Sequence, residues 1–323
     1  MNILVTGGAG FIGSNIVEAL LQRDDVTTVR VLDNLETGYI HNLKRFQNHP
    51  KFQFIEGDIR NFETCLNAAK DIDLICHQAA LGSVPRSIAD PLTTNAVNIT
   101  GTLNIFNAAK ESNIKRVVYA ASSSTYGDSK KLPKVENRIG NPLSPYAVTK
   151  LVNELYANVF SNIYGIEFIG LRYFNVFGPN QSPNGAYAAV VPLFMQALLD
   201  GKSPKINGDG QQSRDFTHVA NAVQANIKAL FTTNKKAVNQ VYNVAVGDQT
   251  TLVDMFSMLR AVAQSDIEPI FGPPRMGDIK HSLADISKAK KLLGYNPQIN
   301  IKIGLQLTFE WFKKNNEASA LVS

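Results

Sequence analysis

The sequence has few cysteines and no long apolar run. Only Cys65 and Cys76 are cysteines among its 323 residues. Without a Cys-x-x-Cys pair, neither a disulfide framework nor a zinc–cysteine site is expected. The five histidines show no metal-ligand spacing, so we expect no metal site. No stretch reaches the roughly 18 consecutive apolar residues of a membrane span, and we expect no membrane partner.

The N-terminus lacks the basic start and long apolar run of a secretory signal. Met1 and Asn2 lead directly into a short apolar stretch that ends in glycines, so we expect a cytoplasmic protein. The net charge is +5 and the pI is about 9.0, but Lys and Arg are scattered along the chain. Nucleic-acid binding is therefore not expected, and the mild positive excess suits a small anionic ligand.

The first half alternates between short apolar strands and amphipathic helices, which predicts parallel β-α-β units. The expected fold class is α/β, a Rossmann-type doubly wound parallel sheet with a smaller α+β substrate-binding domain. The strands are expected near residues 3–5, 29–33, 52–55, 74–76, 117–120 and 168–171, and the helices near residues 11–23, 65–70, 95–112 and 145–164.

The pattern changes after Phe177, where residues 178–185 are rich in Gly, Pro, Asn and Ser. This composition predicts a boundary between a first domain of residues 1–177 and a second of residues 178–323, although residues 215–250 could return to the first. In the second part, helices are expected near residues 188–200, 219–232, 251–264, 285–293 and 302–315, and strands near residues 204–206 and 240–245.

A glycine-rich turn is the first functional signal. Gly7, Gly10 and Gly13, with Phe11 and Ile12 between the last two, follow the first strand and open the first helix. Glycines let the backbone approach a pyrophosphate, and the helix N-terminus offers free N–H donors. In this strand–turn–helix context the motif predicts a dinucleotide site.

The second strand ends in Asp33, twenty residues after Gly13, where an acid can bind the adenosine ribose. None of the next four residues is basic, so a 2′-phosphate would be repelled and NAD is predicted over NADP. Asn34 and Gly38 lie in the loop that follows. Asp58 and Ile59 follow the third strand and are predicted to meet the adenine, although Asp58 could instead cap a helix.

A Tyr-x-x-x-Lys pair is the second signal. Tyr146 and Lys150 are four residues apart on a predicted helix and share one face. A nearby ammonium and a positive nicotinamide ring can lower the tyrosine pKa, so that the phenol acts as a base. The pair alone is common on protein surfaces. It is more specific here because the fifth strand runs into Ser122, Ser123 and Ser124.

The chain resembles the extended short-chain dehydrogenase/reductases. It is most similar to the UDP-galactose 4-epimerase family, in the branch that prefers N-acetylated UDP-hexosamines. Several motifs carry this resemblance: residues 6–13, 77–87, 144–150, 172–178, 214–216 and 277–278. The resemblance implies a homodimer whose helices 95–112 and 146–164 form a four-helix bundle.

The resemblance also implies roles for individual residues. Ser122 would be the hydroxyl partner, Tyr146 the base and Lys150 its activator. Gln78, Ala79, Ala80, Asn98 and Tyr173 would join the NAD site. The UDP-sugar would be held by Gly82, Ser83, Arg86, Ser122, Ser123, Ser124, Asn175, Ala189, Val190, Asn207, Arg214, Arg275, Asp278 and Ser282.

The activity that the resemblance implies is the interconversion of UDP-GlcNAc and UDP-GalNAc. Hydride passes to bound NAD, a 4-keto sugar turns in the cleft, and hydride returns to the opposite face. Ser282 would leave room for an N-acetyl group, although an ordinary surface serine is the alternative. Arg86, Lys280 or His281 facing C6 would instead favour a uronic acid such as UDP-GlcNAcA.

Other activities of this fold stay open at this point. A UDP-glucose/UDP-galactose 4-epimerase is one alternative. Same-fold dehydratases and decarboxylases carry carboxylates where this chain has Ser123 and Ser124, which makes them less favoured. A net NAD-consuming dehydrogenase is another alternative. A non-catalytic NAD-binding regulator would be expected to have lost Tyr146 or Lys150.

Overall fold

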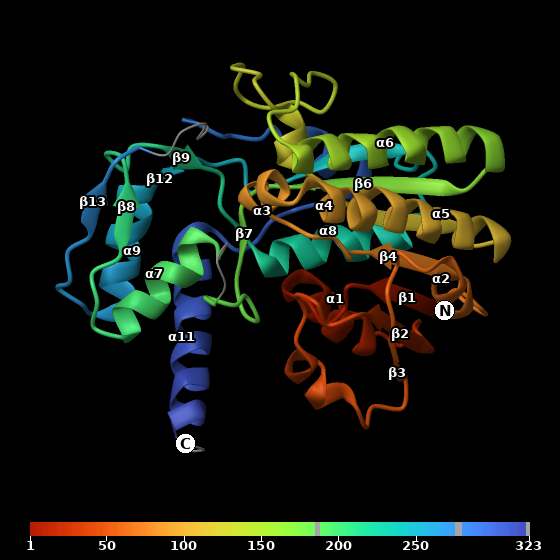
Figure 1. The fold of residues 1–323 in the computed structure, drawn as a ribbon, viewed down its shortest axis with the longest axis horizontal. Helices are drawn as coiled ribbons and strands as arrows, with labels where there is room; N and C mark the ends of the chain where they lie inside the picture. The colour runs from red at the N-terminus through yellow and green to blue at the C-terminus, as the bar shows by residue number, and fades with distance from the viewer. Residues whose placement is uncertain (185–187, 275–279, 321–323) are drawn as a thin grey trace.

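A seven-stranded sheet, parallel throughout, forms the centre of the molecule (Figure 1). The computed structural model describes residues 1–184, 188–274 and 280–320. In spatial order the strands are β11 (Gln240–Val244), β6 (Glu167–Tyr173), β5 (Arg116–Ser122), β4 (Leu74–His77), β1 (Asn2–Thr6), β2 (Thr28–Asp33) and β3 (Phe52–Glu56). This architecture confirms the predicted Rossmann-type α/β class.

Apolar side chains on both faces of the sheet hold helices against it, as expected for a parallel sheet. Ile3 and Val5 share one core with helices α1 and α8. Leu4 and Ile75 share the opposite core with α2, α5 and α6. The bounds of these helices are α1 (Phe11–Leu21), α8 (Val219–Phe231), α2 (Phe62–Ala68), α5 (Thr102–Glu111) and α6 (Pro145–Tyr164).

The helix expected over residues 95–112 differs from the observed one. The observed helical region starts earlier, with α3 (Val84–Ala89) and α4 (Pro91–Asn95). A π-helical segment (Ala96–Gly101) then joins α4 to α5. Asn98 lies in this wider turn, and its side-chain amide bonds both backbone groups of Leu81, at 2.8 and 3.1 Å. This pairing with another loop is a long-range contact that helical periodicity does not reveal.

Two elements from the second half of the sequence belong to the sheet layers. β11 pairs with β6, and α8 packs against α1 and β4. Where the chain is best divided into domains stays a prediction.

The remaining elements surround a third core, to the left in Figure 1, in which Phe194, Phe256 and Leu305 are buried. They are β7 (Val176–Phe177), α7 (Val190–Leu199), β8 (Lys205–Asn207), β9 (Ser213–Arg214), β10 (Thr217–His218), β12 (Thr250–Thr251), α9 (Leu252–Ala263), β13 (Ile270–Gly272) and α11 (Ile301–Ala320). The exception is α10 (Ser287–Leu293), which packs against β11 and α8 and belongs to the first core. Among the described residues, no helix is both long and apolar enough to cross a membrane.

Candidate active site

A cavity of about 570 Å³ lies at the carboxyl ends of the central strands, where ligands bind in doubly wound sheets. One end is walled by the glycine turn and the other by the Ser122–Tyr146–Lys150 group. Of the residues predicted to bind the cofactor, those on its wall are Gly7, Gly10, Phe11, Ile12, Gly13, Asp33, Asn34, Gly38, Asp58, Ile59, Gln78, Ala79, Ala80, Tyr146, Lys150 and Tyr173.

The glycine turn packs its backbone directly against the backbone that follows β4. Gly7 has a positive φ of 69°, and a Cβ there would lie 2.6 Å from the amide nitrogen of Ala79. Gly10 precedes α1 without any side-chain cap, and the first turn of α1 carries no acidic residue. The first N–H groups of α1 are therefore available to an anion such as a pyrophosphate.

Asp33 is a buried carboxylate at the end of β2. Its two oxygens accept hydrogen bonds from the backbone N–H groups of Ala9 and Leu35, each at 2.9 Å. Burial raises the pKa of Asp33, and these two bonds oppose the rise. The carboxylate therefore stands at a fixed place on the cavity wall, where it suits hydroxyl groups and disfavours a phosphate.

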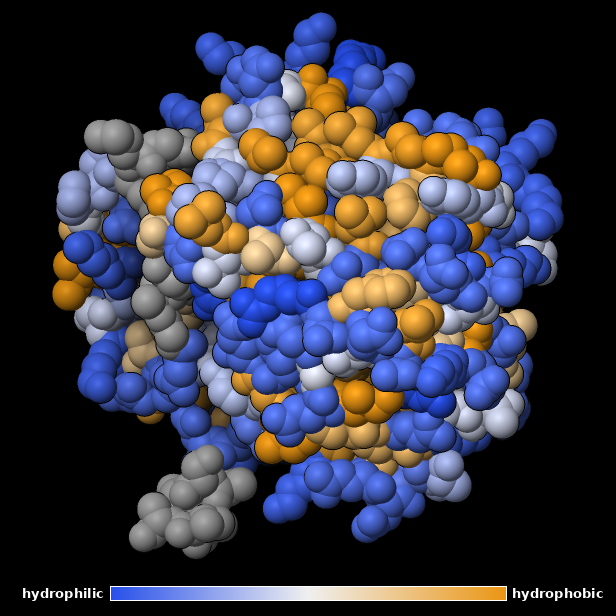
Figure 2. Space-filling model, turned by 45° about the vertical axis from the view of Figure 1, so that its right-hand side comes forward, coloured by the Kyte–Doolittle hydropathy of each residue, from blue (hydrophilic) through white to orange (hydrophobic). Residues whose placement is uncertain are grey.

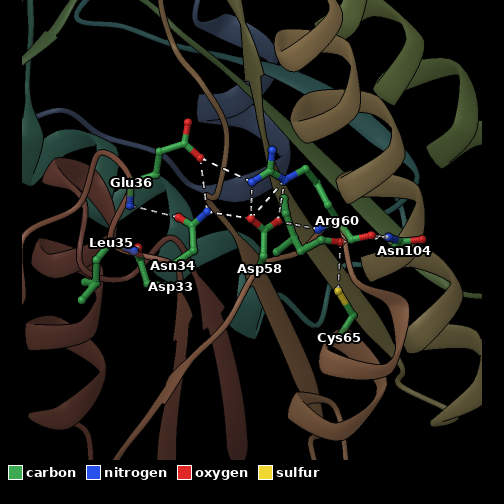
Figure 3. A network of polar contacts seen from close by, with 9 residues as sticks. Asp33, Asn34, Leu35, Glu36, Asp58, Arg60, Cys65 and Asn104 are labelled. Atoms are coloured by element: carbon green, nitrogen blue, oxygen red, sulfur yellow. Dashed lines mark hydrogen bonds and ion pairs between the residues drawn. The ribbon is translucent and has the colours of Figure 1, made fainter.

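A polar network lies beside Asp33 at the same end of the cavity (Figure 3). Arg60 holds both oxygens of Asp58, and Asn34 donates to Asp58 at 2.9 Å. Glu36 lies 3.7 Å from the Arg60 guanidinium. The Arg60 bond lowers the pKa of Asp58 to about 2. The cap of α2 is Asn61, which accepts from the N–H of Thr64, so Asp58 faces the cavity without serving as a helix cap.

The reactive end of the cavity combines Ser122, Tyr146 and Lys150. The backbone N–H and the hydroxyl of Ser124 both donate to Ser122 Oγ, at 3.1 and 2.9 Å. Ser122 is thereby left to donate its own proton, and it bonds the Tyr146 phenol. Lys150 Nζ donates to the carbonyl of Ala120 at 2.8 Å and lies 5.9 Å from the centre of the Tyr146 ring.

Burial shapes the protonation of this group. It raises the pKa of Tyr146, while the hydrogen bond from Ser122 lowers it. Burial lowers the pKa of Lys150 to about 8, and the Glu154 carboxylate opposes this fall. Burial therefore disfavours the charged form of both groups, so Tyr146 can act as a base only where a positive charge beside it, such as the Lys150 ammonium, stabilises the phenolate.

Gln78 and Tyr173 are locked together beside the cavity. Tyr173 donates its hydroxyl proton to Gln78 Oε1 at 2.9 Å, and Asn226 donates to the same tyrosine oxygen at 2.8 Å. Gln78 closes the ring with a bond to Asn226 at 3.1 Å. Asn98, the remaining residue predicted for the NAD site, lies beneath the wall, where it holds the Leu81 backbone.

A second cavity of about 610 Å³ adjoins the first. The two cavities share Gly82, Asn175, Val176, Ala188 and Ala189. Of the residues predicted to hold the sugar nucleotide, those on the second wall are Gly82, Ser83, Asn175, Ala189, Val190, Asn207 and Arg214.

Other predicted substrate residues have different positions. Arg86 and Ser123 line the first cavity, and Ser124 bonds Ser122. Ser282 donates its backbone N–H to Ser213 at 3.1 Å, and neither described cavity wall includes it. Arg275 and Asp278 lie outside the described residues.

Asp215 has a role that the sequence pattern did not reveal. This fully buried carboxylate accepts from the backbone N–H groups of Val246, Gly247 and Ala284, at 3.0, 3.1 and 3.2 Å. Burial raises its pKa to about 7. It ties three loops together next to Arg214. Its place directly after Arg214 in the 214–216 motif is the only sequence signal for this role.

The segment read from sequence as a domain boundary is part of the site. Gln181, Ser182 and Asn184 line the first cavity, as the glycine turn does. In the described part of the chain, no three His, Cys, Asp or Glu side chains are grouped as metal ligands would be.

Comparison with known proteins agrees with this geometry. Residues 3–245 match the NAD dependent epimerase/dehydratase family. A UDP-glucose 4-epimerase from Mycolicibacterium smegmatis is 37% identical, covering 98% of this chain and all of that one. A UDP-N-acetylglucosamine 4-epimerase structure from Methanobrevibacter ruminantium M1 has a TM-score of 0.92 and 42% identity, covering 97% and 98% of the two chains.

A third similar structure is a UDP-glucuronic acid 4-epimerase from Bacillus cereus in complex with UDP-glucuronic acid and NAD. Its TM-score is 0.90 and its identity 32%, with 98% of this chain and all of that one covered. The chain belongs to the NAD dependent epimerase/dehydratase family, among the extended short-chain dehydrogenases/reductases. Its cofactor is NAD, and the uncapped α1 N-terminus and Asp33 in the first cavity fit this dinucleotide.

Proposed function

We propose that the protein is a nucleotide-sugar 4-epimerase that interconverts UDP-GlcNAc and UDP-GalNAc. The carrying observation is the shared wall of the two cavities. The first cavity contains the dinucleotide features and ends at Tyr146. The second carries Arg214, whose guanidinium suits a pyrophosphate. A UDP-sugar in the second cavity would therefore present its hexose to Tyr146.

In this proposal each residue of the reactive group has one task. NAD, when bound, accepts hydride from C4 of the sugar and returns it. Tyr146 takes the proton of the 4-hydroxyl and later returns it. The Lys150 ammonium stabilises the phenolate, and Ser122 donates a hydrogen bond to the substrate oxygen.

The choice of an N-acetylhexosamine rests on one relative, and the choice of an epimerase over a dehydratase rests on the residues next to Ser122. The 42%-identical relative is a UDP-N-acetylglucosamine 4-epimerase. Next to Ser122, the positions 123 and 124 are serines, whose hydroxyls leave the site without the carboxylate that elimination of water would use there. Ser282 as the residue that makes room for the N-acetyl group stays a prediction.

One observation favours a uronic acid as a second candidate. Arg86 lines the first cavity together with Gly82, a residue of the shared wall, and a guanidinium there could pair with a carboxylate at C6. Lys280 and His281 are exposed, and His281 Nδ1 lies 2.7 Å from Ser213 Oγ. Neither described cavity wall includes these two residues, so only Arg86 supports this candidate.

The test is an NMR assay of the purified protein, without added cofactor, on UDP-GlcNAc, UDP-GlcNAcA and UDP-Glc in parallel. Rapid formation of UDP-GalNAc from UDP-GlcNAc is the expected result. Turnover of UDP-GlcNAcA alone, abolished in Arg86→Gln, would establish the second candidate. A keto sugar or a pentose as the final product would overturn the epimerase assignment.

We also propose that two copies of the chain pair through helix α6 and its neighbours. Val148, Leu155 and Ile163 form an exposed apolar stripe along α6, and Leu92 on the adjacent α4 is 81% exposed. Figure 2 shows apolar residues gathered across the upper part of this face. A patch of this kind marks an interaction surface. Its continuity along two packed helices suits a symmetric partner copy.

Light scattering coupled to gel filtration tests this pairing. The parent is expected at twice the mass of the chain, and Leu155→Glu, which places a charge in the stripe, at the mass of one chain. Ile303→Glu is the matched control, because Ile303 is an exposed isoleucine on α11. A monomeric parent would contradict the proposal.

A further inference from the structure

The segment of residues 178–184 crosses between the two halves of the site. It follows strand β7, which pairs with β10 on the substrate side. From there it reaches helix α1, where Asn15 Nδ2 donates to the carbonyl of Pro179 at 3.0 Å. Asn180 Nδ2 donates to Ser14 Oγ at 3.0 Å. The segment is thus attached to the helix that begins at the glycine turn.

The attachment lies beside the cofactor cavity. Gln181, Ser182 and Asn184 line that cavity, as do Gly10 and Phe11 at the start of α1. Residues 178–184 and the glycine turn are therefore two walls of the same space. The bonds from Asn15 and Asn180 join these walls.

The attachment involves a buried residue, Ser14, and a residue with left-handed backbone conformation, Asn180. Ser14 is fully buried, and its hydroxyl also donates to the carbonyl of Phe11 at 3.1 Å. Asn180 has a positive φ of 69°, a conformation in which asparagine and glycine are the favoured residues. Both residues are therefore suited to this one arrangement.

We propose that residues 178–184 form a strap that keeps NAD in the first cavity during turnover, with Asn15 and Asn180 as its positioning residues. In an epimerase the molecule that accepts hydride must also return it, so release between the two transfers would end the cycle. The strap limits that release because its two bonds must open before the walls can separate. The proposal concerns the cofactor and does not depend on which sugar is the substrate.

The experiment measures NAD release from the purified holoenzyme. Protein is freed of unbound NAD by gel filtration, and the NAD that subsequently appears in the filtrate of a spin filter is quantified over time. The variants are Asn180→Gly, which keeps the positive φ, Asn15→Ala, which suits a helix interior, and the double variant. Asn113→Gly is the matched control, because Asn113 is exposed and has a φ of 53°.

We expect NAD release to become several-fold faster in each single variant and more than tenfold faster in the double variant, since each lost hydrogen bond weakens the strap. The control should release NAD at the parental rate. Turnover by the double variant should fall after gel filtration and recover when NAD is added. The thermal midpoint of the NAD-free protein should differ little between parent and Asn180→Gly.

Release within twofold of the parental rate in both single variants and in the double variant would overturn the proposal. Equally fast release from Asn113→Gly would also overturn it, since any asparagine-to-glycine change would then act alike. If the double variant fails to fold, Asn180→Gly alone decides. A chain that binds UDP-sugars but shows no epimerase activity would contradict the proposed function without changing the NAD release measurement.

Discussion

At the residue scale, hydrogen bonds from Ser124 leave the hydroxyl proton of Ser122 free to be donated. Ser124 donates twice to Ser122, so that Ser122 can donate to Tyr146. Lys150 donates one hydrogen bond to the Ala120 carbonyl at 2.8 Å, which holds its ammonium group near the phenol. In the proposed mechanism Tyr146 is the group of the three that takes a proton from the substrate.

Tyr146→Phe removes that base and keeps the ring. We expect kcat to fall about 10³-fold, within the range for a lost general base, while the bound NAD stays at the parental level. Initial rates and NAD content measure the two effects. Tyr164→Phe, on the same helix with its ring against Phe160, is the control and should retain parental activity. A loss of less than tenfold in Tyr146→Phe would contradict the assigned role.

Asp33 is predicted to set the preference for NAD over NADP. Its carboxylate is fixed by Ala9 and Leu35 and would repel a 2′-phosphate, so we expect NADP to bind at least tenfold more weakly than NAD. In Asp33→Asn the difference in affinity between NAD and NADP should become smaller, because the negative charge of the carboxylate is removed. Titration of the NAD-free protein with each nucleotide measures both ratios. Equal affinities in the parent would contradict this interpretation.

At the scale of elements, His77 joins β1, β4 and α5. Its ring nitrogens lie 2.6 Å from Thr6 Oγ1 and 3.0 Å from Thr102 Oγ1. Burial lowers the pKa of His77 to about 3 and that of His218 to about 4. Both rings are therefore neutral in the folded chain at pH values where the unfolded chain binds protons.

The free energy of unfolding should consequently fall as the pH drops below about 6.5, the pKa of histidine in an unfolded chain. Between pH 7.5 and 5.0 we expect His77 to account for a loss of about 2 kcal/mol, at about 1.4 kcal/mol per pKa unit. Urea unfolding at the two pH values measures this loss. His77→Asn should be less stable at both and should lose about 2 kcal/mol less between them. An unchanged pH dependence in the variant would contradict the prediction.

At the scale of the whole molecule, the predicted cofactor cavity lies between segments that are distant in the sequence. The first cavity is walled by the glycine turn and the start of α1 near the N-terminus, and by residues from 173–184 and 188–189 near the middle of the chain. A ligand that binds the folded chain and not the unfolded one stabilises it by mass action.

Removal of NAD should therefore lower the thermal midpoint. At an NAD concentration of 100 times Kd the expected stabilisation is about 2.7 kcal/mol, which corresponds to a midpoint several degrees higher than that of the NAD-free protein. Thermal unfolding with and without NAD measures this difference. NADP at the same concentration is the control and should raise the midpoint less, and an equal rise would contradict the predicted cofactor preference.

The sequence by itself determined the features that depend on short-range spacing. The strand–glycine turn–helix order, Asp33 at the end of β2 and the four-residue interval between Tyr146 and Lys150 each follow from local periodicity, so the fold class and the cofactor could be predicted.

Only the tertiary structure decided which distant segments meet. It showed that β11 pairs with β6, that Asn34 donates to Asp58, that Asp215 ties three loops, and that residues 178–184 line the cofactor cavity. The physical reason is that these contacts join residues tens to more than a hundred positions apart. They depend on how whole elements pack, which no local pattern records.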